Sequence, residues 1–324
     1  MSKPSWGASM RWLLLAIILA YLALGTLYAL FTPAWQAPDE PAHYNYVRYL
    51  AEQHRFPILK PGDYPAAYLE EIKAARFPPE MSIEPIRYEF HQPPLYYLLV
   101  VPVYQLFGSA LLPLRLFSVG LGAFLLLVAY WTVQVLAPRQ LLLALGTAAF
   151  VAFLPMHLAM TAAANNDTLA ELLLATILLL SIRYLRASAA LSGEASPDAP
   201  CSDARLVVLL GITTGLGLVT KSSVYIALPL VLATILARRL WLDRPTASLA
   251  RGLQDAALYL LPALALALPW WLRNTAHYGG LDFLGLGRHD QVVAGQLRTA
   301  EFIAEHGLGR LLTDFFQTSF HSFW

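Results

Sequence analysis

The sequence predicts an all-α, polytopic membrane protein: a helical bundle of about seven transmembrane helices, with juxtamembrane helices in its first outside loop. Three observations predict this class. Charged residues make up only 13% of the 324 positions and hydrophobic residues 57%, whereas a soluble domain carries roughly 25% charged residues. The mean hydropathy is +0.53. The apolar residues also gather in segments near the length of about 20 residues that crosses a bilayer.

The predicted spans follow one another along residues 1–274, which we treat as one transmembrane module. The first, at about 12–32, carries no charge and is longer than the apolar core of a signal peptide, which predicts an uncleaved anchor. Six further spans are predicted at about 113–137, 140–163, 168–185, 206–220, 222–237 and 254–272. Polar stretches separate or follow them: an outside loop at 33–92, a loop at 187–204, and an outside tail at 275–324.

Positive charge decides whether the apolar stretch 93–108 crosses the bilayer. This stretch is short and contains Pro93, Pro94 and Pro102. Because short cytoplasmic loops collect Lys and Arg, Lys3 and Arg11 place the N-terminus in the cytoplasm. If 93–108 does not cross, the later basic clusters lie inside as well: Arg139, Arg183, Arg186, Arg205, Arg238, Arg239, Arg244 and Arg251. We therefore predict a juxtamembrane or re-entrant helix at 93–108, and a multi-pass protein of the cytoplasmic membrane whose outside face is the active one.

The strongest local feature follows the first predicted span, where Asp39, Glu40 and His43 stand close together. Asp39 is placed to cap a helix that tolerates Pro41 in its first turn, so that Asp39 and His43 share one helical face. Two carboxylates beside an imidazole suit a divalent metal ion or a general base for a hydroxyl nucleophile. Spacing alone favours a plainer alternative, in which Asp39 only caps the helix and His43 is an interfacial residue.

A second feature opens the juxtamembrane stretch, where residues 88–97 read YEFHQPPLYY. His91 and Gln92 precede the proline pair in a segment that is expected to be extended, free to face whatever the loop covers. Tyr96, Tyr97 and Tyr104 fit an aromatic belt at the boundary between water and lipid. We favour this anchoring interpretation for the three tyrosines.

The sequence places one more acid and three cations on the predicted outside face. Asp167 either caps the helix that follows it or brings a third carboxylate to the face of Asp39. Arg115 opens the second span and Arg273 ends the seventh, where snorkelling is the plainer interpretation for each alone. Lys221 lies in a turn between apolar arms of 15–16 residues, too short to cross a core of about 30 Å. Lys221, with Ser222 and Ser223, is therefore predicted to lie below the outer surface, where it suits a lipid phosphate.

Together these features resemble the GT-C glycosyltransferases that use polyprenyl-phosphate sugars, a group that includes protein O-mannosyltransferases and lipid A aminoarabinose transferases. The resemblance extends over about residues 10–280. It is carried by the order and the shared face of several motifs: the acidic pair, the proline-rich loop with HQPPLYYLL, the Arg that opens the second span, the Asn-Asn-Asp turn and the Thr-Lys-Ser turn. No single motif is diagnostic.

The resemblance implies transfer of a sugar from a lipid phosphate to a hydroxyl or amine, usually with inversion. Asp39, with Glu40 beside it, matches an aspartate that serves as base or metal contact, and Asp167 matches a second acid. We assign the donor phosphate to Arg115, Lys221, Ser222, Arg273, His91 and Gln92, and a divalent metal ion, where one is used, to Asp39, His43 and Asp167. The expected partners are the polyprenyl-phosphate sugar, the lipid bilayer, and an acceptor glycan, lipid or protein that the sequence does not identify.

Two other functions stay open at this point. A transporter or flippase of lipid-linked intermediates would need a polar path between the two faces, which Gly211, Gly215 and Gly217 could line. A non-catalytic remnant would explain the apolar, aromatic end of the chain at 320–324, which we interpret as an incomplete continuation of the tail. The net charge of +1 implies no attraction to nucleic acid, and the single Cys201 allows no internal disulfide.

Overall fold

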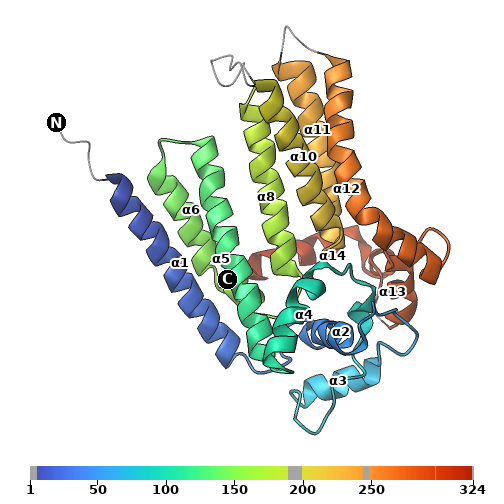
Figure 1. Ribbon diagram of the computed structural model, residues 1–324. Helices are drawn as coiled ribbons and strands as arrows, with labels where there is room; N and C mark the ends of the chain where they lie inside the picture. The colour runs from blue at the N-terminus through green and yellow to red at the C-terminus, as the bar shows by residue number, and fades with distance from the viewer. Residues whose placement is uncertain (1–5, 189–198, 244–247, 296, 323–324) are drawn as a thin grey trace.

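The computed structural model describes residues 6–188, 199–243, 248–295 and 297–322 (Figure 1). Over these residues the chain is helical and contains no strand, which confirms the predicted all-α class. The helices of the bundle are α1 (Trp6–Phe31), α5 (Leu111–Leu136), α6 (Leu141–Phe153), α7 (Pro155–Thr161), α8 (Asp167–Arg186), α10 (Ala199–Leu218), η2 (Ser222–Ile226), α11 (Ala227–Ala237), η3 (Arg238–Leu242) and α12 (Leu249–Tyr278). The helices outside it are α2 (Glu40–Gln53), α3 (Ala66–Ala74), η1 (Tyr88–His91), α4 (Leu95–Phe107), α13 (Leu286–Val292) and α14 (Thr299–Ser322).

By length and composition, five of the described helices can cross a membrane, and a sixth span is formed if α6 and α7 are counted together. These two helices meet at an angle of 64°, because Pro155 cannot continue the hydrogen bonding of α6 and starts a new helix. The remaining predicted span, 206–220, corresponds to α10, whose described apolar part is the shorter Ala204–Leu218. Lys3, Arg244, most of the predicted loop at 187–204 and the last two residues lie outside the described part.

Small residues let α10 pack closely against α12. A Cβ atom on Gly211 would lie 2.3 Å from the carbonyl oxygen of Tyr259, and one on Gly215 would lie 3.0 Å from that of Ala263. This spacing of glycines four residues apart is typical of close contacts between membrane helices. A Cβ atom on Gly217 would likewise lie only 2.4 Å from a methyl carbon of Val224. The three glycines are therefore positions of close packing between helices.

The helices are arranged so that α1 ends and α5 begins at the same end of the bundle (Figure 1). Arg115, in the first turns of α5, donates hydrogen bonds to the carbonyl oxygens of Ala29, Thr32 and Pro33, where α1 ends. The intervening chain, which contains α2, α3, η1 and α4, thus returns to the end of the bundle that it left. We call this the loop end. The start of α8, the short helix η2 and the last turn of α12 also lie at this end of the bundle.

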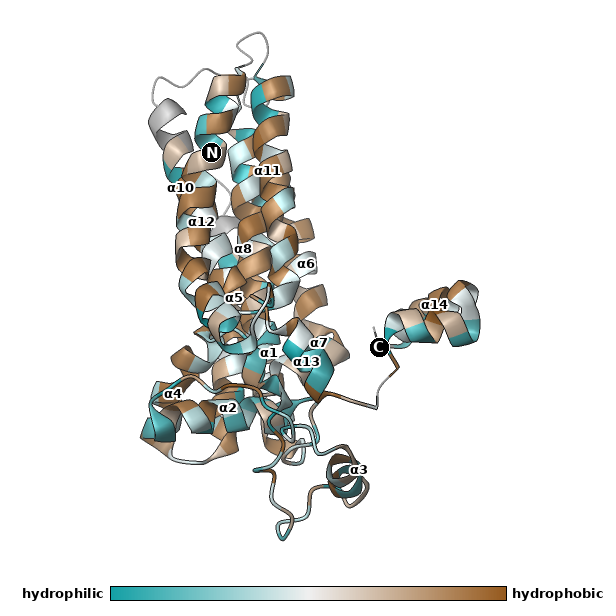
Figure 2. Cartoon of the chain, turned by 90° about the vertical axis from the view of Figure 1, so that its right-hand side faces the viewer, coloured by the Kyte–Doolittle hydropathy of each residue, from teal (hydrophilic) through white to brown (hydrophobic). Residues whose placement is uncertain are grey.

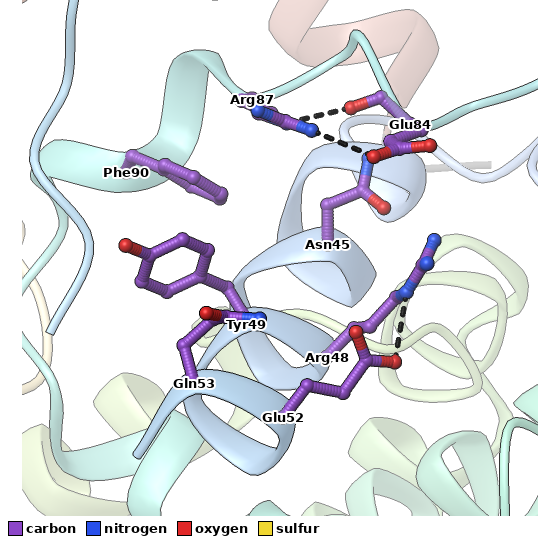
Figure 3. Close-up of a pocket in the computed structure, with 8 residues that line it drawn as sticks. All are labelled: Asn45, Arg48, Tyr49, Glu52, Gln53, Glu84, Arg87 and Phe90. Carbon is purple, nitrogen blue, oxygen red and sulfur yellow. Dashed lines mark hydrogen bonds and ion pairs between the residues drawn. The ribbon is translucent and has the colours of Figure 1, made fainter. Parts of the chain in front are cut away.

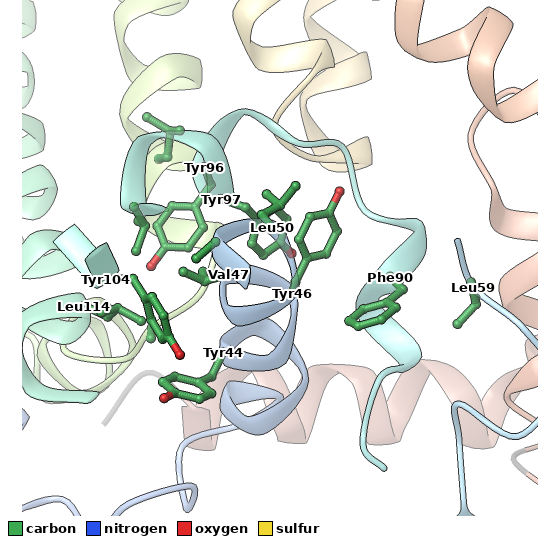
Figure 4. Close-up of a cluster of buried hydrophobic side chains, with 14 of the residues drawn as sticks. Tyr44, Tyr46, Val47, Leu50, Leu59, Phe90, Tyr96, Tyr97, Tyr104 and Leu114 are labelled. Atoms are coloured by element: carbon green, nitrogen blue, oxygen red, sulfur yellow. The ribbon is translucent and has the colours of Figure 1, made fainter. Parts of the chain in front are cut away.

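An aromatic core holds the loop end together (Figure 4). In it α2 packs against α4, and the rings of Tyr46 and Tyr97 stack with centroids 3.7 Å apart. Tyr96 and Tyr97 are fully buried and Tyr104 is 9% exposed. Their hydroxyl groups bond within the protein, to Ser118, His43 and Glu52 respectively. The predicted aromatic belt is therefore wrong for these three tyrosines, which form a protein core and do not face lipid.

The chain after α12 forms α13 and α14. The helix α13 packs against η1, and Val292 joins the aromatic core. The helix α14 stands apart from the bundle and makes few contacts with it (Figure 2). The same view shows that hydrophobic residues dominate the long helices, whereas hydrophilic residues gather around α2 and α3.

Candidate functional site

Glu40 and Arg115 form a buried ion pair at the loop end. Arg115 donates from Nε to Oε1 of Glu40 over 2.7 Å and from Nη2 to Oε2 over 2.6 Å. The Glu40 side chain is 0% exposed and that of Arg115 3%. The carboxylate also accepts hydrogen bonds from the backbone N–H groups of Trp35 and Ala164. The pair thereby joins the end of α1, the start of α2, the start of α5 and the link between α7 and α8.

This pairing leaves neither residue free for a ligand. A guanidinium group has five N–H donors, and those of Arg115 are used by the two oxygens of Glu40 and by three carbonyl oxygens. The three carbonyls are at the C-terminal end of α1, where a helix lacks internal partners and attracts positive charge. The structure favours a structural role for Arg115 and Glu40 over the predicted contacts with donor phosphate and acceptor.

Asp39, the neighbour of Glu40, is in a different environment. It is exposed and immediately precedes α2 in the left-handed conformation, with φ at 58°. Its side chain makes no capping hydrogen bond; Oδ1 accepts one from the hydroxyl of Tyr88 over 2.7 Å. Burial raises the pKa of Tyr88, and the nearby Asp39 raises it further, so Tyr88 stays a donor. No other side-chain hydrogen bond reaches Asp39 among the described residues, and the carboxylate is available to a substrate.

His43 lies at the centre of the charged residues of the loop end. It is 3% exposed, and its Nδ1 is 2.8 Å from the hydroxyl of Tyr97. Burial is the main cause that lowers the pKa of His43, and the positive charge of Lys221 lowers it further. The carboxylates of Glu89, Asp39 and Asp167 raise this pKa and offset part of the shift. His43 is thus neutral at pH 7. The four charged groups thus act on His43 electrostatically, whereas its direct side-chain contact is with Tyr97.

Lys221 and Asp167 pair directly. The Nζ of Lys221 is 2.5 Å from Oδ1 of Asp167, and the two side chains are 22% and 39% exposed. An ammonium group has three donors, so the ion pair leaves others for a ligand. Ser222 follows at the start of η2. The helical segment after this turn, 222–242, is long enough to cross a membrane, whereas the described apolar part of the helix before it, Ala204–Leu218, is shorter. The depth of Lys221 stays a prediction.

Gln92 is held between three parts of the loop end. Its Oε1 accepts a hydrogen bond of 3.3 Å from Asn166, whose Nδ2 also donates to the carbonyl oxygen of Thr220. Its own carbonyl oxygen accepts from the hydroxyl of Tyr46. Gln92 therefore ties η1 to the start of α8 and to the turn that carries Lys221.

His91 faces the C-terminal part of the chain, away from Lys221. It is 4% exposed, its Nδ1 bonds to the carbonyl oxygen of Tyr88, and its ring lies 4.6 Å from that of His289 in α13. Burial, and secondly His289, lower the pKa of His91 to about 3. At pH 7 it carries no positive charge to offer a phosphate, and a direct role in donor binding stays a prediction.

The depressed pKa of His91 predicts a pH dependence of stability. An exposed histidine titrates near pH 6.5, whereas folded His91 titrates at about pH 3. Between these two values His91 is protonated in the unfolded state and neutral in the folded state. The free energy of unfolding should therefore fall by about 1.4 kcal/mol per pH unit on acidification in this window. Thermal unfolding of the wild type and of His91→Gln between pH 7 and 5 measures this, and the variant should lose less stability. Parallel curves for the two proteins would contradict it; the exposed His277→Gln is the control.

Arg273 lies near the C-terminal end of α12 and anchors the first loop. Its Nη2 donates to the carbonyl oxygen of Pro57 and its Nη1 to Asn274. The guanidinium group also lies over the ring of Trp270, 4.5 Å from its centroid. These contacts hold the segment around Pro57 against the C-terminal part of α12, and a contact of Arg273 with donor phosphate stays a prediction.

Glu89 is a site residue that the sequence reasoning missed. The side chain is 8% exposed, and its Oε2 is buried without a hydrogen-bond partner among the described residues. Buried carboxylates are normally paired, so an unpaired one next to His43 points to a ligand. The available signal was its place two residues before His91, in front of the rigid proline pair.

Asp39, His43 and Asp167, the residues predicted to hold a metal ion, do not gather into one metal-binding cluster in the described structure. Among the described residues, no three side chains of His, Cys, Asp or Glu gather closely enough to hold a metal ion, and this includes Asp39, His43 and Asp167. His43 is directed to Tyr97 and Asp167 to Lys221.

Comparison with known protein families identifies the family of this chain. The sequence model of the dolichyl-phosphate-mannose-protein mannosyltransferase family matches residues 75–280, which is more than half of the chain. The chain belongs to this family. Membership indicates a multi-pass membrane glycosyltransferase that takes its sugar from a polyprenyl-phosphate donor. No match was found among curated proteins or among solved structures.

The part of the chain that matches the mannosyltransferase family includes Glu89, Asp167 and Lys221, together with the helices that position them. It begins after Asp39 and His43, so the family match does not cover these two residues. The cluster around His43 joins both parts of the sequence at the loop end.

Proposed function

We propose that this chain transfers a sugar from a polyprenyl-phosphate donor to a hydroxyl or amine of an acceptor, at the outer face of the cytoplasmic membrane and with inversion at the anomeric carbon. One observation carries the proposal: the exposed carboxylate Asp39, which has no ion pair among the described residues, and the cation Lys221, which has spare donors, are linked through η1. Tyr88 at the start of η1 binds Asp39, and Gln92 just after η1 binds Asn166, the neighbour of the Asp167 that pairs with Lys221. Transfer with inversion needs these two groups, a base on the acceptor and a cation on the departing phosphate.

In the proposed reaction, Asp39 takes the proton of the acceptor hydroxyl or amine as its oxygen or nitrogen bonds to the anomeric carbon. The bond between that carbon and the phosphate oxygen breaks, and polyprenyl phosphate leaves with the electron pair. Lys221, with the Ser222 hydroxyl beside it, stabilises the negative charge that develops on the phosphate. Tyr88 fixes one oxygen of Asp39 and leaves the other to the acceptor.

The test uses the purified chain with a panel of radiolabelled polyprenyl-phosphate hexoses, mannose included, and membrane extracts as the source of acceptor. We expect release of polyprenyl phosphate together with label in an acceptor. Movement of a lipid-linked sugar across vesicle membranes, without release of polyprenyl phosphate, would contradict the proposal and favour the transporter.

Lys221→Gln should lower kcat/KM for the donor about 10- to 100-fold, the loss expected for a hydrogen bond to a charged group. Lys221→Arg keeps the charge and should restore part of the activity. The matched control is Lys73→Gln, because Lys73 forms an exposed ion pair with Glu70 in α3. Equal activities of Lys221→Gln and Lys73→Gln would remove Lys221 from the donor site.

Glu89→Gln should separate function from stability. We expect donor turnover to fall about 10- to 100-fold, since the acceptor loses a charged hydrogen-bond partner. Thermal stability should stay equal or rise, since an unpaired buried charge is removed. A variant that unfolds earlier but retains its turnover would show that Glu89 is structural.

A further inference from the structure

Two adjacent pockets lie on the side of α2 that faces residues 84–90. The first, of about 140 Å³, lies between α2 and the segment that carries Glu84, Arg87 and Phe90 (Figure 3). The second, of about 210 Å³, shares Arg87, Phe90 and Tyr49 with it and is closed on the other side by residues 55–63. We call the second the basic pocket; its main lining side chains are Tyr49, Arg55, Phe56, Lys60, Arg87 and Phe90.

Charge distinguishes the two pockets. In the first, Arg48 pairs with Glu52 and Arg87 with Glu84, as the dashed lines of Figure 3 show. The basic pocket is lined by three cations and one carboxylate, Asp63; of the three cations, Arg87 is already paired with Glu84, which does not line this pocket. Arg55 and Lys60 form no ion pair in the described part of the chain. The first loop as a whole holds nine acids and six bases over residues 33–92, so half of its bases gather in one pocket although the loop is acidic.

The walls of the basic pocket are fixed in place. The ring of Phe56 packs edge-on against Trp270 with centroids 5.6 Å apart, and Arg273 binds the carbonyl oxygen of Pro57. The backbone N–H of Leu59 donates to the hydroxyl of Tyr278 over 3.2 Å. On the opposite wall, Arg87 donates from its backbone to the carbonyl oxygen of Asp63. A pocket whose walls are already ordered binds its ligand at a lower entropic cost.

The basic pocket is separated from the reacting group. Tyr49 lies ten residues after Asp39 along α2, which at 1.5 Å per residue is about 15 Å. On the opposite wall, Arg87 adjoins Tyr88, whose hydroxyl binds Asp39; the pocket therefore extends along α2 away from Asp39. Six of the eight lining residues also precede the segment that matches the mannosyltransferase family, so the pocket is largely built from sequence outside that match.

We propose that the basic pocket binds a negatively charged sugar unit of the acceptor, bearing a phosphate or a carboxylate, at least one unit away from the sugar or group that is glycosylated. This inference rests on the proposed function, because it names the acceptor class of that site. Arg55, Lys60 and Arg87 bind the anionic group by charge-assisted hydrogen bonds. The rings of Tyr49, Phe56 and Phe90 supply apolar surface for the sugar ring.

The pocket suits a saccharide better than an acidic peptide. Peptides are commonly bound along a strand edge or in a groove that admits a helix, and the described part of the chain has no strand. The volume of about 210 Å³ is below the roughly 300–1,000 Å³ of pockets for drug-sized ligands. It admits one ring with its charged substituent.

The test measures binding to the full chain in lipid nanodiscs by titration calorimetry. The probes are glucose 6-phosphate, glucuronate, glucose, inorganic phosphate and a tetraglutamate peptide. We expect glucose 6-phosphate and glucuronate to bind at least about tenfold more tightly than glucose or inorganic phosphate. The double variant Arg55→Gln/Lys60→Gln should weaken both charged sugars at least about tenfold, the loss expected when two charged hydrogen bonds are removed. Phe56→Ala should weaken the charged sugars and leave inorganic phosphate unchanged.

The matched control removes the same charge elsewhere in the loop. Lys73→Gln/Arg76→Gln should bind the charged sugars like the wild type, and Lys60→Gln alone serves if the double variant unfolds early. Equal binding of glucose and glucose 6-phosphate, binding of inorganic phosphate or tetraglutamate as tight as that of the charged sugars, or equal losses in the two double variants would each overturn the proposal. Binding needs no transfer, so repeating the titration with Asp39→Asn separates a failure of this pocket from a failure of the proposed function.

Discussion

Asp39→Asn should lower sugar transfer by about 10²- to 10⁴-fold, the usual contribution of a positioned general base. Asparagine keeps the size of the side chain and its hydrogen bond to Tyr88, but it cannot take the acceptor proton. It also tolerates the left-handed backbone at this position, where φ is 58°. The loss therefore reports on the carboxylate and not on backbone strain. Donor turnover is measured beside donor binding, which should not change.

The control for Asp39→Asn is Glu71→Gln, which removes a carboxylate from an exposed position of α3 in the same loop. Glu71→Gln should retain its turnover. If Asp39→Asn also retained turnover, Asp39 would not be the base, and the proposed reaction would need another group in that role.

Arg115→Ala should destabilise the fold by about 3–5 kcal/mol, the cost of leaving a buried charge without its partner. The variant leaves the Glu40 carboxylate, which is 0% exposed, without its cationic partner. It also leaves the three carbonyl oxygens at the end of α1 without their donor. The junction of α1, α2 and α5 depends on this residue, so activity should be lost together with the fold. Thermal unfolding in detergent and the yield of monodisperse protein measure the effect.

The control for Arg115→Ala is a pair of similar geometry in an exposed place. Arg310 and Asp314 lie 2.9 Å apart with side chains 64% and 34% exposed. Arg310→Ala should cost at most about 1 kcal/mol, as exposed ion pairs contribute little. Comparable losses for the two variants would contradict the structural role of Arg115. An Arg115→Ala protein that is stable but does not bind donor would restore the original expectation of a phosphate contact.

The sequence sufficed for the features that depend on hydrophobicity. The apolar segments predicted an all-α bundle, and the prediction that 93–108 does not cross agrees with the place of α4 at the loop end. The sequence did not predict which charged residues pair with each other. Asp39 and Glu40 are adjacent acids in the sequence, yet one is exposed and the other fully buried against Arg115. The choice is made by a partner 75 positions away along the chain, which no local pattern reveals.

Contacts between distant parts of the chain also explain the other differences between the predictions and the structure. Tyr96 and Tyr97 match an aromatic belt by composition, but stacking against Tyr46 in α2 buries them. Lys221 was expected to lie below the surface; the structure shows its ion pair with Asp167, which no local pattern of the sequence reveals. Glu89 attracts notice only through its unpaired oxygen, a property of packing and not of sequence.

The most direct test of the account is the side of the membrane at which the cluster of Asp39, Asp167 and Lys221 emerges. In a Cys201→Ser background, Glu80→Cys places a label at the loop end and Arg139→Cys at the opposite end, both at exposed positions. A membrane-impermeant maleimide should label Glu80→Cys in intact cells and Arg139→Cys only after permeabilisation. Labelling of both from one compartment, or the reverse pattern, would contradict transfer at the outer face.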